Sequence, residues 1–253
     1  MRKALTALAV SILLLLPTSA GAITNGQPDG SRHPMVGMLA FYDDAGVYQH
    51  RCTGTLMSAT VVLTASHCTD GMSSARAYFD TEVTADYKAG QGGTVGTPFT
   101  SPAFNPHTLT NDVAVVELVA NPGIPGPYPT LPDAGFLSRL KRLHQLQDDK
   151  FVAVGYGGVT QSPPPVITFD LIRRVAVSSY AGLKPNNLHL FQNPVPAGDG
   201  GTCFGDSGGP HFWNRTLKVV SVTSWGDAIC RSNDQTQRLD LPSVLAFLED
   251  HGL

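Results

Sequence analysis

The segment Cys203-Phe-Gly-Asp-Ser-Gly-Gly-Pro210 decides how the rest of the sequence is interpreted. Glycines on both sides of Ser207 let the backbone turn sharply and leave the serine hydroxyl exposed. The same turn leaves backbone N–H groups free to point toward a negatively charged oxygen. The segment therefore predicts a nucleophilic serine that has donors for an oxyanion beside it.

The same string also fits a different class of serine hydrolase. Gly205 to Gly209 satisfies the G-x-S-x-G elbow of α/β-hydrolases, in which an acid and then a histidine follow the serine. Here only His211 and His251 follow Ser207, the first four residues later and the second near the end of the chain. The pattern of parallel strands is missing as well. The order of the motifs therefore argues against the α/β-hydrolase alternative.

Two upstream segments supply the partners that a serine nucleophile needs. Leu63-Thr-Ala-Ser-His67-Cys68 places a histidine at the end of a strand-like run, and Asn111-Asp112-Val-Ala-Val-Val places an acid at the start of another. A serine hydroxyl needs a neutral imidazole to take its proton and an acid to orient that imidazole. We interpret His67, Asp112 and Ser207 as the general base, the orienting acid and the nucleophile.

Composition narrows the class of protein. The chain has 253 residues and a formal net charge of −3, with 42% apolar and 15% charged residues, which argues against intrinsic disorder. It contains no cluster of lysine and arginine of the kind that nucleic-acid binding needs. The 26 glycines and 19 prolines favour short strands joined by turns. Strand-like runs recur at 35–42, 52–57, 61–65, 113–118, 151–154, 175–177 and 219–224.

A proline-rich segment divides the chain. Residues 121–132 contain five prolines, so they cannot form a regular helix or a central strand. We interpret them as an extended connector between an N-terminal half, about 23–120, and a C-terminal half, 133–253. Regularly spaced leucines predict a short helix within the second half at 136–147. An amphipathic pattern with a proline at its start predicts a C-terminal helix at 241–253.

The N-terminus has the layout of a secretory signal peptide. Arg2 and Lys3 form a basic start, residues 4–16 form an apolar run, and Ala20-Gly-Ala22 provides a cleavage site of small residues. A membrane anchor is the alternative, but 13 residues are too few to cross a bilayer, which takes about 20. We therefore expect residues 1–22 to be a signal peptide and the protein to be secreted.

Export changes how the cysteines are interpreted. An even number of cysteines in an exported chain predicts disulfides, and four cysteines allow three pairings. A zinc site is the competing interpretation, but no C-x-x-C or paired-histidine spacing supports it. No metal and no cofactor are expected. The four residues are Cys52, Cys68, Cys203 and Cys230.

These motifs together resemble the chymotrypsin-like, or trypsin-like, family of secreted serine proteases. The resemblance covers most of the chain after residue 22, so residues 23–253 are expected to form one protease domain. It implies an all-β fold of two antiparallel six-stranded β-barrels with a C-terminal α-helix and the triad between the barrels. It also implies the disulfides Cys52–Cys68 and Cys203–Cys230. The motifs that carry it are Cys52-Thr-Gly-Thr-Leu, Leu63 to Cys68, Asn111 to Leu118, Gly155-Tyr-Gly157, Cys203 to Pro210 and Ser224-Trp-Gly226.

The family also assigns roles around the nucleophile. By resemblance, the backbone N–H groups of Gly205 and Ser207 form the oxyanion hole, and Ser224 supports Asp112. Residues 224–226 would hold the substrate backbone as an added strand. The substrate-binding positions implied by the resemblance are Gly201, Thr202, Ser224, Trp225, Gly226 and Thr236.

The residue at the base of the specificity pocket departs from the trypsin pattern. Trypsin-like members carry an aspartate six residues before the nucleophile, and this chain has Gly201 there. The sequence therefore predicts cleavage that is not restricted to arginine or lysine at P1, the residue on the acyl side of the cleaved bond. Asp227 and Asp234 stay open as sources of a displaced charge, which keeps basic P1 residues as the alternative.

The start of the protease domain bears on activation. In the family an aliphatic N-terminal residue pairs through its α-amine with the acid before the nucleophile, which corresponds here to Ile23 and Asp206. The sequence Ile23-Thr-Asn25-Gly differs mildly from the usual Ile-Val-Gly-Gly, and Asn tolerates the left-handed conformation better than most residues. The predicted signal cleavage falls between Ala22 and Ile23. We therefore hypothesise that signal removal itself makes the activating terminus.

The main hypothesis is a secreted serine endopeptidase that works through an acyl-enzyme. A catalytically silent binding protein and an esterase-like hydrolase are the alternatives. The silent protein usually has a replaced triad residue, and none is replaced here. Expected partners are peptide or protein substrates and protein protease inhibitors, with no nucleic acid and, after signal removal, no membrane. A monomer is expected.

Overall fold

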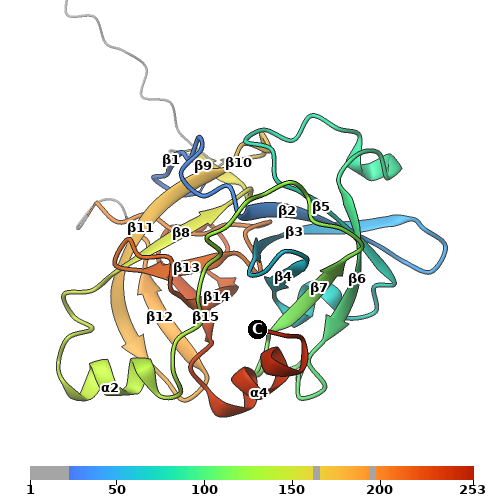
Figure 1. Ribbon diagram of the computed structural model, residues 1–253. Helices are drawn as coiled ribbons and strands as arrows, with labels where there is room; N and C mark the ends of the chain where they lie inside the picture. Colours follow the sequence, from blue (N-terminus) through green and yellow to red (C-terminus); the bar gives the residue numbers. More distant parts are fainter. Residues whose placement is uncertain (1–22, 162–165, 194–197) are drawn as a thin grey trace, which may run out of the picture.

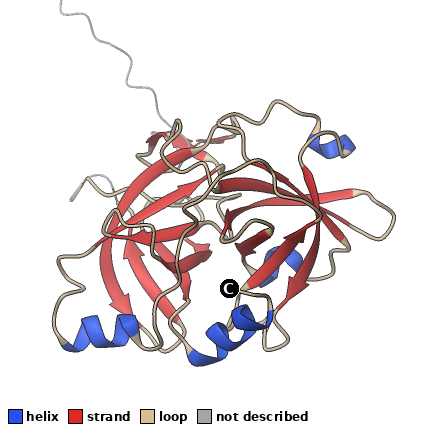
Figure 2. Cartoon of the chain, in the orientation of Figure 1, coloured by secondary structure: helices blue, strands red, loops and turns tan. Residues whose placement is uncertain are grey.

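The computed structural model describes residues 23–161, 166–193 and 198–253, so the predicted signal peptide lies outside the described residues (Figure 1). Strands make up most of the regular secondary structure of the described residues, and the helices are short (Figure 2). None of the helices in the described ranges is long and apolar enough to cross a bilayer.

Six strands form the first barrel, which closes in the order β2-β3-β4-β7-β6-β5 with antiparallel pairing. Valine, leucine and other apolar side chains predominate in β2, β4 and β7, and most of them are buried. The strands are β2 (Val36–Tyr42), β3 (Tyr48–Leu56), β4 (Val61–Thr64), β5 (Ser74–Tyr78), β6 (Thr94–Thr100) and β7 (Ala114–Leu118).

The second barrel also has six antiparallel strands, in the order β8-β11-β12-β15-β14-β13, and the β13–β8 pairing closes it. The short strand β1 (Gln27–Pro28) joins the sheet at β11. A two-stranded hairpin of β9 (Val159–Gln161) and β10 (Val166–Thr168) lies outside the barrel. The barrel strands are β8 (Lys150–Gly155), β11 (Arg174–Leu183), β12 (Asn187–Phe191), β13 (Pro210–Trp213), β14 (Val219–Gly226) and β15 (Asn233–Arg238).

This architecture confirms the predicted fold class of two six-stranded barrels with a C-terminal helix. Helix α4 (Pro242–Asp250) begins with a proline, whose missing N–H costs nothing at the first helical position. Both predicted disulfides, Cys52–Cys68 and Cys203–Cys230, are formed. The other helical elements of the described residues are α1 (Ser66–Thr69), α2 (Phe136–Arg142) and the 3-10 turn η1 (Tyr87–Ala89).

Helix α2 is shorter than predicted, ending at Arg142 instead of Gln147. His144 adopts a left-handed φ of 55°, which stops the helix and turns the chain. The leucines therefore divide: Leu143 is exposed, whereas Leu146 lies after the turn and is fully buried. A leucine period alone did not show where this turn falls.

Candidate active site

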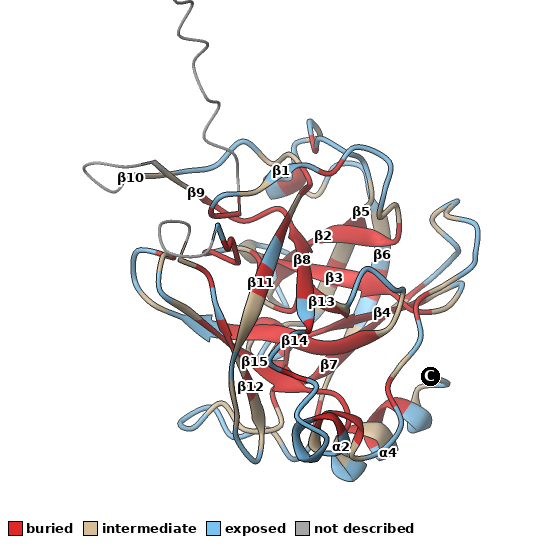
Figure 3. Ribbon diagram, turned by 90° about the vertical axis from the view of Figure 1, so that its left-hand side faces the viewer, coloured by how far each residue is buried: buried red, intermediate tan, exposed pale blue. Residues whose placement is uncertain are grey.

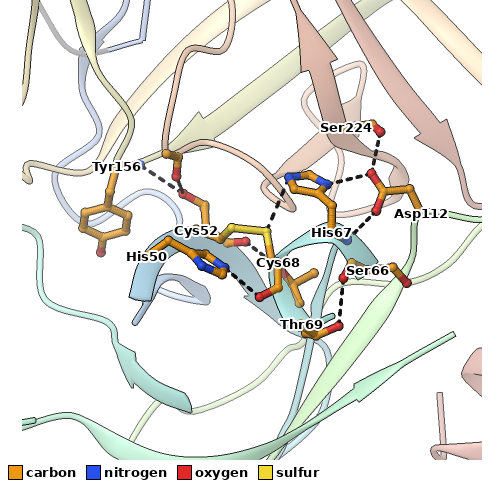
Figure 4. The surroundings of a disulfide bond; sticks show 12 residues. His50, Cys52, Ser66, His67, Cys68, Thr69, Asp112, Tyr156 and Ser224 are labelled. Carbon is orange, nitrogen blue, oxygen red and sulfur yellow. Dashed lines mark hydrogen bonds and ion pairs between the residues drawn. A yellow bond between two sulfur atoms is a disulfide. The ribbon is translucent and has the colours of Figure 1, made fainter. Parts of the chain in front are cut away.

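His67 and Asp112 are brought together by the first barrel. His67 lies in α1, directly after β4, and Asp112 lies just before β7. His67 Nδ1 is 2.8 Å from Asp112 Oδ2, and the backbone N–H of His67 donates to Asp112 Oδ1 at 2.9 Å (Figure 4). One carboxylate thus binds both the ring and the backbone of the histidine. This arrangement fixes the ring orientation and leaves Nε2 as the nitrogen that can accept a proton.

The second barrel holds the same carboxylate from the other side. Ser224 Oγ donates to Asp112 Oδ2 at 2.5 Å, as the family resemblance implied. The backbone N–H of Asp112 donates to Gln237 Oε1 at 3.1 Å. Asp112 is fully buried, so these donors replace the water that an exposed carboxylate would bind. The acid is therefore fixed between the two barrels.

A disulfide bond lies next to His67. Cys52 on β3 is bonded to Cys68, the residue after His67, and Cys68 Sγ is 3.7 Å from His67 Nε2 (Figure 4). Cys52, His67 and Cys68 form the one group of potential metal ligands found in the described ranges. Both sulfurs are engaged in the disulfide, so neither is available as the thiolate that zinc binds.

The loop that carries Ser207 requires glycine at two positions. Gly205 has φ of 98° and Gly208 has φ of 75°, a region that other residues rarely adopt. A Cβ at Gly208 would lie 2.1 Å from Thr64 Oγ1. The backbone N–H of Thr53 donates to the Ser207 carbonyl at 2.9 Å, which attaches the loop to the first barrel. The loop is therefore hydrogen-bonded to β3 and packed closely against the end of β4.

The predicted oxyanion donors are available. Within the described chain, the backbone N–H groups of Gly205 and Ser207 have no hydrogen-bond acceptor. The Ser207 hydroxyl makes no hydrogen bond to His67 in the same ranges. Such contacts are often long in proteins without substrate and shorten when it binds. The loop thus presents two free donors and an unengaged hydroxyl.

A cavity of about 190 Å³ opens beside Ser207. Of the predicted substrate-binding residues, the cavity takes in Thr202, Ser224, Trp225 and Gly226. Gly201 and Thr236 are not among its lining residues in the described chain, and Thr236 Oγ1 instead donates to the Leu188 carbonyl at 3.0 Å inside the barrel. The cavity is lined by Thr202, Cys203, Phe204, Ser207, Thr223, Ser224, Trp225, Gly226, Asp227 and Cys230.

Asp206 points away from the cavity into the protein. Its carboxylate accepts the backbone N–H of Gly157 at 2.7 Å and that of Cys203 at 2.9 Å. Burial raises the pKa of Asp206 to about 7, although these two donors and Arg51 act in the opposite direction. The residue is therefore a buried acid with two backbone donors and an unfavourable environment for its charge.

The segment that begins at Ile23 is inserted near this acid. Ile23 is fully buried, and its N–H donates to the Gly158 carbonyl at 3.2 Å. Asn25 has φ of 55°, the left-handed conformation expected where a glycine usually stands, and its side chain donates to the Gly198 carbonyl at 3.0 Å. In the full chain the nitrogen of Ile23 is an amide. An ion pair with Asp206 would require cleavage before this residue.

Sequence reasoning did not identify two residues of this site. Gln237, which accepts the N–H of Asp112, lies on the polar strand β15 and carries no local motif. Thr53 lies inside a quoted motif, yet its contacts with the Ser207 loop involve residues more than 150 positions away. Pairing between strands distant in sequence is what creates both contacts.

Comparisons with known proteins place the chain in a family. The family model described as Trypsin matches residues 24–239. A protein named Trypsin, alkaline B, from Manduca sexta is 25% identical over 234 residues, which are 88% of each chain. Serine protease 1 of Drosophila melanogaster is 27% identical over 91% of this chain and 86% of its own length.

Solved structures show the same architecture. HL collagenase matches with a TM-score of 0.67 at 18% identity, covering 90% of this chain and 98% of the other. The scabies mite inactivated protease paralogue S-I1 matches with a TM-score of 0.63 at 18% identity, covering 89% and 97%. Likeness at these identities shows the fold, and the family model extends over most of the sequence. The chain therefore belongs to the trypsin family of serine proteases.

Proposed function

We propose that this protein is a secreted serine endopeptidase with His67, Asp112 and Ser207 as its catalytic triad. The observation that carries the proposal is the double contact of Asp112 with the ring and the backbone of His67, reinforced by Ser224. The substrates of the protein are peptides or proteins, and protein protease inhibitors are expected to bind the same cleft.

The chemistry follows from these positions. His67 Nε2 takes the proton of the Ser207 hydroxyl as Oγ attacks the peptide carbonyl. The carbonyl oxygen becomes negatively charged and accepts hydrogen bonds from the backbone N–H groups of Gly205 and Ser207. The C–N bond then breaks, His67 gives the proton to the leaving amine, and an acyl-enzyme ester remains on Ser207. Water activated by His67 hydrolyses that ester and restores the free serine.

The contributions of the oxyanion donors and of Asp112 to the rate of catalysis can be measured. Loss of one oxyanion donor typically costs about 2.7–4 kcal/mol of transition-state stabilisation. Replacement of the orienting acid by its amide typically lowers kcat about 10⁴-fold, because the imidazole adopts the wrong tautomer. Asp112→Asn is therefore expected to be a nearly inactive protein with an intact fold.

Activation is proposed to follow from signal removal. Cleavage between Ala22 and Ile23 would turn the buried amide of Ile23 into an α-amine whose charge could pair with Asp206. Ile23 has φ of 60°, which is strained for a β-branched residue. This angle is defined by the peptide bond to Ala22, so cleavage of that bond would release the strain. N-terminal sequencing of the secreted, active protein should give Ile23 first. An active enzyme that starts elsewhere would contradict this route.

Fluorophosphonate labelling tests the proposed activity. The probe should attach to Ser207 of the secreted protein, as mapped by peptide mass spectrometry. Ser207→Ala should remain folded by circular dichroism and should not label. Loss of this hydroxyl should also abolish peptide cleavage, with an effect on the order of 10⁶ in kcat. A folded wild-type protein that starts at Ile23 and does not label would refute the proposal.

A catalytically silent binding protein is the second candidate. The unengaged Ser207 hydroxyl of the described chain fits this function as well as it fits a substrate-free enzyme, and the fold neighbours include an inactivated protease paralogue. The same labelling experiment decides between the two functions. An esterase-like hydrolase would label as well, but it would turn over small esters without cleaving peptides.

A further inference from the structure

The space around Gly201, which the family resemblance places at the base of the specificity pocket, is occupied by a residue outside the family motifs. Gln192 follows β12 directly and is 1% exposed. A Cβ built on Gly201 would lie 2.4 Å from Gln192 Oε1 and 2.5 Å from Gln192 Cβ. These distances are too short for any side chain at position 201. Gln192 thus fills the room that an aspartate at this position would need.

Hydrogen bonds fix the orientation of the Gln192 amide. Its Nε2 donates to Asp227 Oδ1 at 3.2 Å and to the Asn233 carbonyl at 3.1 Å. Nε2 also lies 3.9 Å from the position of a Cβ on Gly226, which lines the cavity. Because both bonds use the nitrogen, Oε1 faces Gly201. The side chain therefore stands behind Gly201 and Gly226 and presents a neutral group there.

Asp227 is the one acid that lines the cavity in the described chain, and the protein already surrounds its charge with donors. Besides Gln192, it accepts the backbone N–H groups of Ser232 at 2.8 Å, Asn233 at 3.0 Å and Arg231 at 3.1 Å. Partial burial would raise its pKa, but these donors outweigh burial and hold the pKa below its usual value. A substrate cation would have to compete with four existing donors.

Asp234, the other acid considered as a displaced charge, does not face the cavity. It is fully buried and is not among the residues that line the cavity in the described ranges. Thr202 Oγ1 donates to Asp234 Oδ2 at 2.6 Å, and His211 Nε2 lies 3.0 Å from the same oxygen. Thr202 itself lines the cavity, so it separates this carboxylate from a bound side chain.

We propose that Gln192 is a specificity-determining residue. It does not line the cavity in the described chain, but it lies behind Gly226 and Asp227, which do, and it fills with an uncharged amide the space that a side chain at position 201 would need. The substrates are peptides with an uncharged side chain of moderate size, such as leucine or methionine, at P1. A cavity of about 190 Å³ is below the roughly 300–1,000 Å³ of pockets for drug-sized ligands and suits a single side chain. This inference rests on the proposed endopeptidase function and names its substrate class.

The first test is a P1 profile of the secreted protein. A set of peptide p-nitroanilides that differ only at P1 should give kcat/KM values for leucine or methionine at least about tenfold above those for arginine and lysine. Equal or faster cleavage after arginine or lysine would overturn the specificity while leaving the proposed function intact. Failure of Ser207 to label with a fluorophosphonate would overturn both, so the two failures are distinguishable.

The second test places the glycine at position 192 and an aspartate at position 201. Because Gln192 Cβ itself lies 2.5 Å from the place that a Cβ at position 201 would take, only glycine at 192 makes room there. The double variant Q192G/G201D should raise the arginine-to-leucine ratio of kcat/KM by at least about tenfold over wild type. Gly201→Asp alone should not, since Gln192 still fills the space.

Controls separate this effect from a general disturbance. Gln145 is an exposed glutamine beyond α2, so Gln145→Ala should leave the P1 profile unchanged. Ser207 labelling of each variant reports whether the site is assembled. If Gly201→Asp alone labels normally and gains cleavage after arginine, Gln192 does not occupy that space and the proposal is wrong. If the variants are not secreted, the wild-type profile still decides the substrate class.

Discussion

The two barrels share the same strand order and both bury apolar clusters, but the second barrel also contains a strand whose buried side chains are all polar or charged. In the first barrel, all seven residues of β2 (Val36–Tyr42) are buried, and nearly all of them are apolar. In the second, five of the six residues of β15 (Asn233–Arg238) are buried, and every residue in the strand is polar or charged (Figure 3). A purely structural barrel has no need of such a strand, because burying polar groups costs free energy unless they are paired.

The position of the polar residues explains the difference. Asp234, Gln235 and Gln237 of β15 lie opposite Gly226, Trp225 and Val222 of β14, the strand that forms one wall of the cavity. Gln237 also supports the backbone of Asp112. The second barrel therefore uses part of its interior to build the site, while the first provides a rigid apolar frame for His67. We infer that the polar residues of β15 serve the site and that stability comes from the apolar clusters, which extend through both barrels.

The largest effect is expected from breaking a buried polar pair of the second barrel. His211 and Asp234 are both fully buried, with Nε2 and Oδ2 3.0 Å apart. His211→Leu places an apolar side chain against the buried carboxylate, which then keeps only the Thr202 hydroxyl among the described residues, and should lower the free energy of unfolding by about 4 kcal/mol. The double variant H211L/D234L should recover most of that loss, because replacing both members of a buried pair by well-packed apolar side chains is often neutral.

Urea unfolding followed by circular dichroism measures both variants. Recovery in the double variant would show that this pair is retained for something other than stability. If the double variant were as unstable as His211→Leu, the polar interior would be a structural requirement of the second barrel. The proposed contrast between the barrels would then be wrong.

A somewhat smaller loss is expected from the first barrel. Leu39 on β2 is fully buried in the apolar core. Leu39→Ala removes buried methyl groups and leaves a cavity, so the free energy of unfolding should fall by about 3 kcal/mol. Urea unfolding should show this loss without any change in the P1 profile. A changed profile would mean that the first barrel also shapes the specificity pocket.

The same contrast explains which parts of the fold were predictable. The runs 35–42, 61–65 and 113–118 predicted β2, β4 and β7 closely, because buried apolar residues give a strong strand pattern. Strand β15 reads Asn-Asp-Gln-Thr-Gln-Arg and has no apolar residue, so no local pattern predicts it. Its strand conformation depends on pairing with β12 and β14, which local sequence does not reveal.

The site divides in the same way. His67 and Asp112 were predictable because each ends or begins a strongly apolar strand, and the glycines near Ser207 mark a required backbone shape. Gln192 was not, because its role comes from filling the space at Gly201 across the barrel. Thr236, expected to line the pocket, faces the barrel interior, and the pairing register of β15 sets that orientation.

The pH dependence of stability should also come from the second barrel. Asp206 has a pKa of about 7 in the folded chain against an ordinary value of 3.8, so between these values the folded state holds a proton that the unfolded state has lost. Stability should therefore fall as pH rises through this window, by about 2 kcal/mol between pH 5 and 7. Urea unfolding of the uncleaved chain across this range measures the slope.

Asp206→Asn is the control for this slope and should flatten it, because the amide does not titrate. Cleavage before Ile23 should reduce the slope as well, since a charged α-amine near Asp206 would lower the pKa of its carboxyl. An identical slope in cleaved and uncleaved protein would contradict the proposed pairing of Ile23 with Asp206.

The smallest effect is expected where the two barrels meet. Tyr156 follows β8 of the second barrel, and its buried hydroxyl donates to the Asp80 carbonyl, just after β5 of the first, at 2.5 Å. Arg173 Nη1 donates to the same hydroxyl at 3.2 Å, and burial raises the pKa of Tyr156 to about 12. The hydroxyl also lies 3.4 Å from the Val36 carbonyl. Tyr156→Phe keeps the ring packing and removes these contacts of the hydroxyl, so we expect a loss of about 1 kcal/mol.

The loss is small because Arg173 keeps its other partners, including Asp29 at 3.0 Å. Tyr128→Phe is the matched control: its partly buried hydroxyl donates to the Ile124 carbonyl within the connecting segment, so the change should cost less than about 0.5 kcal/mol. If Tyr156→Phe instead lost several kcal/mol, the junction would be a main source of stability. The two barrels would then have to be treated as one cooperative unit, in which the apolar frame and the polar site cannot be varied separately.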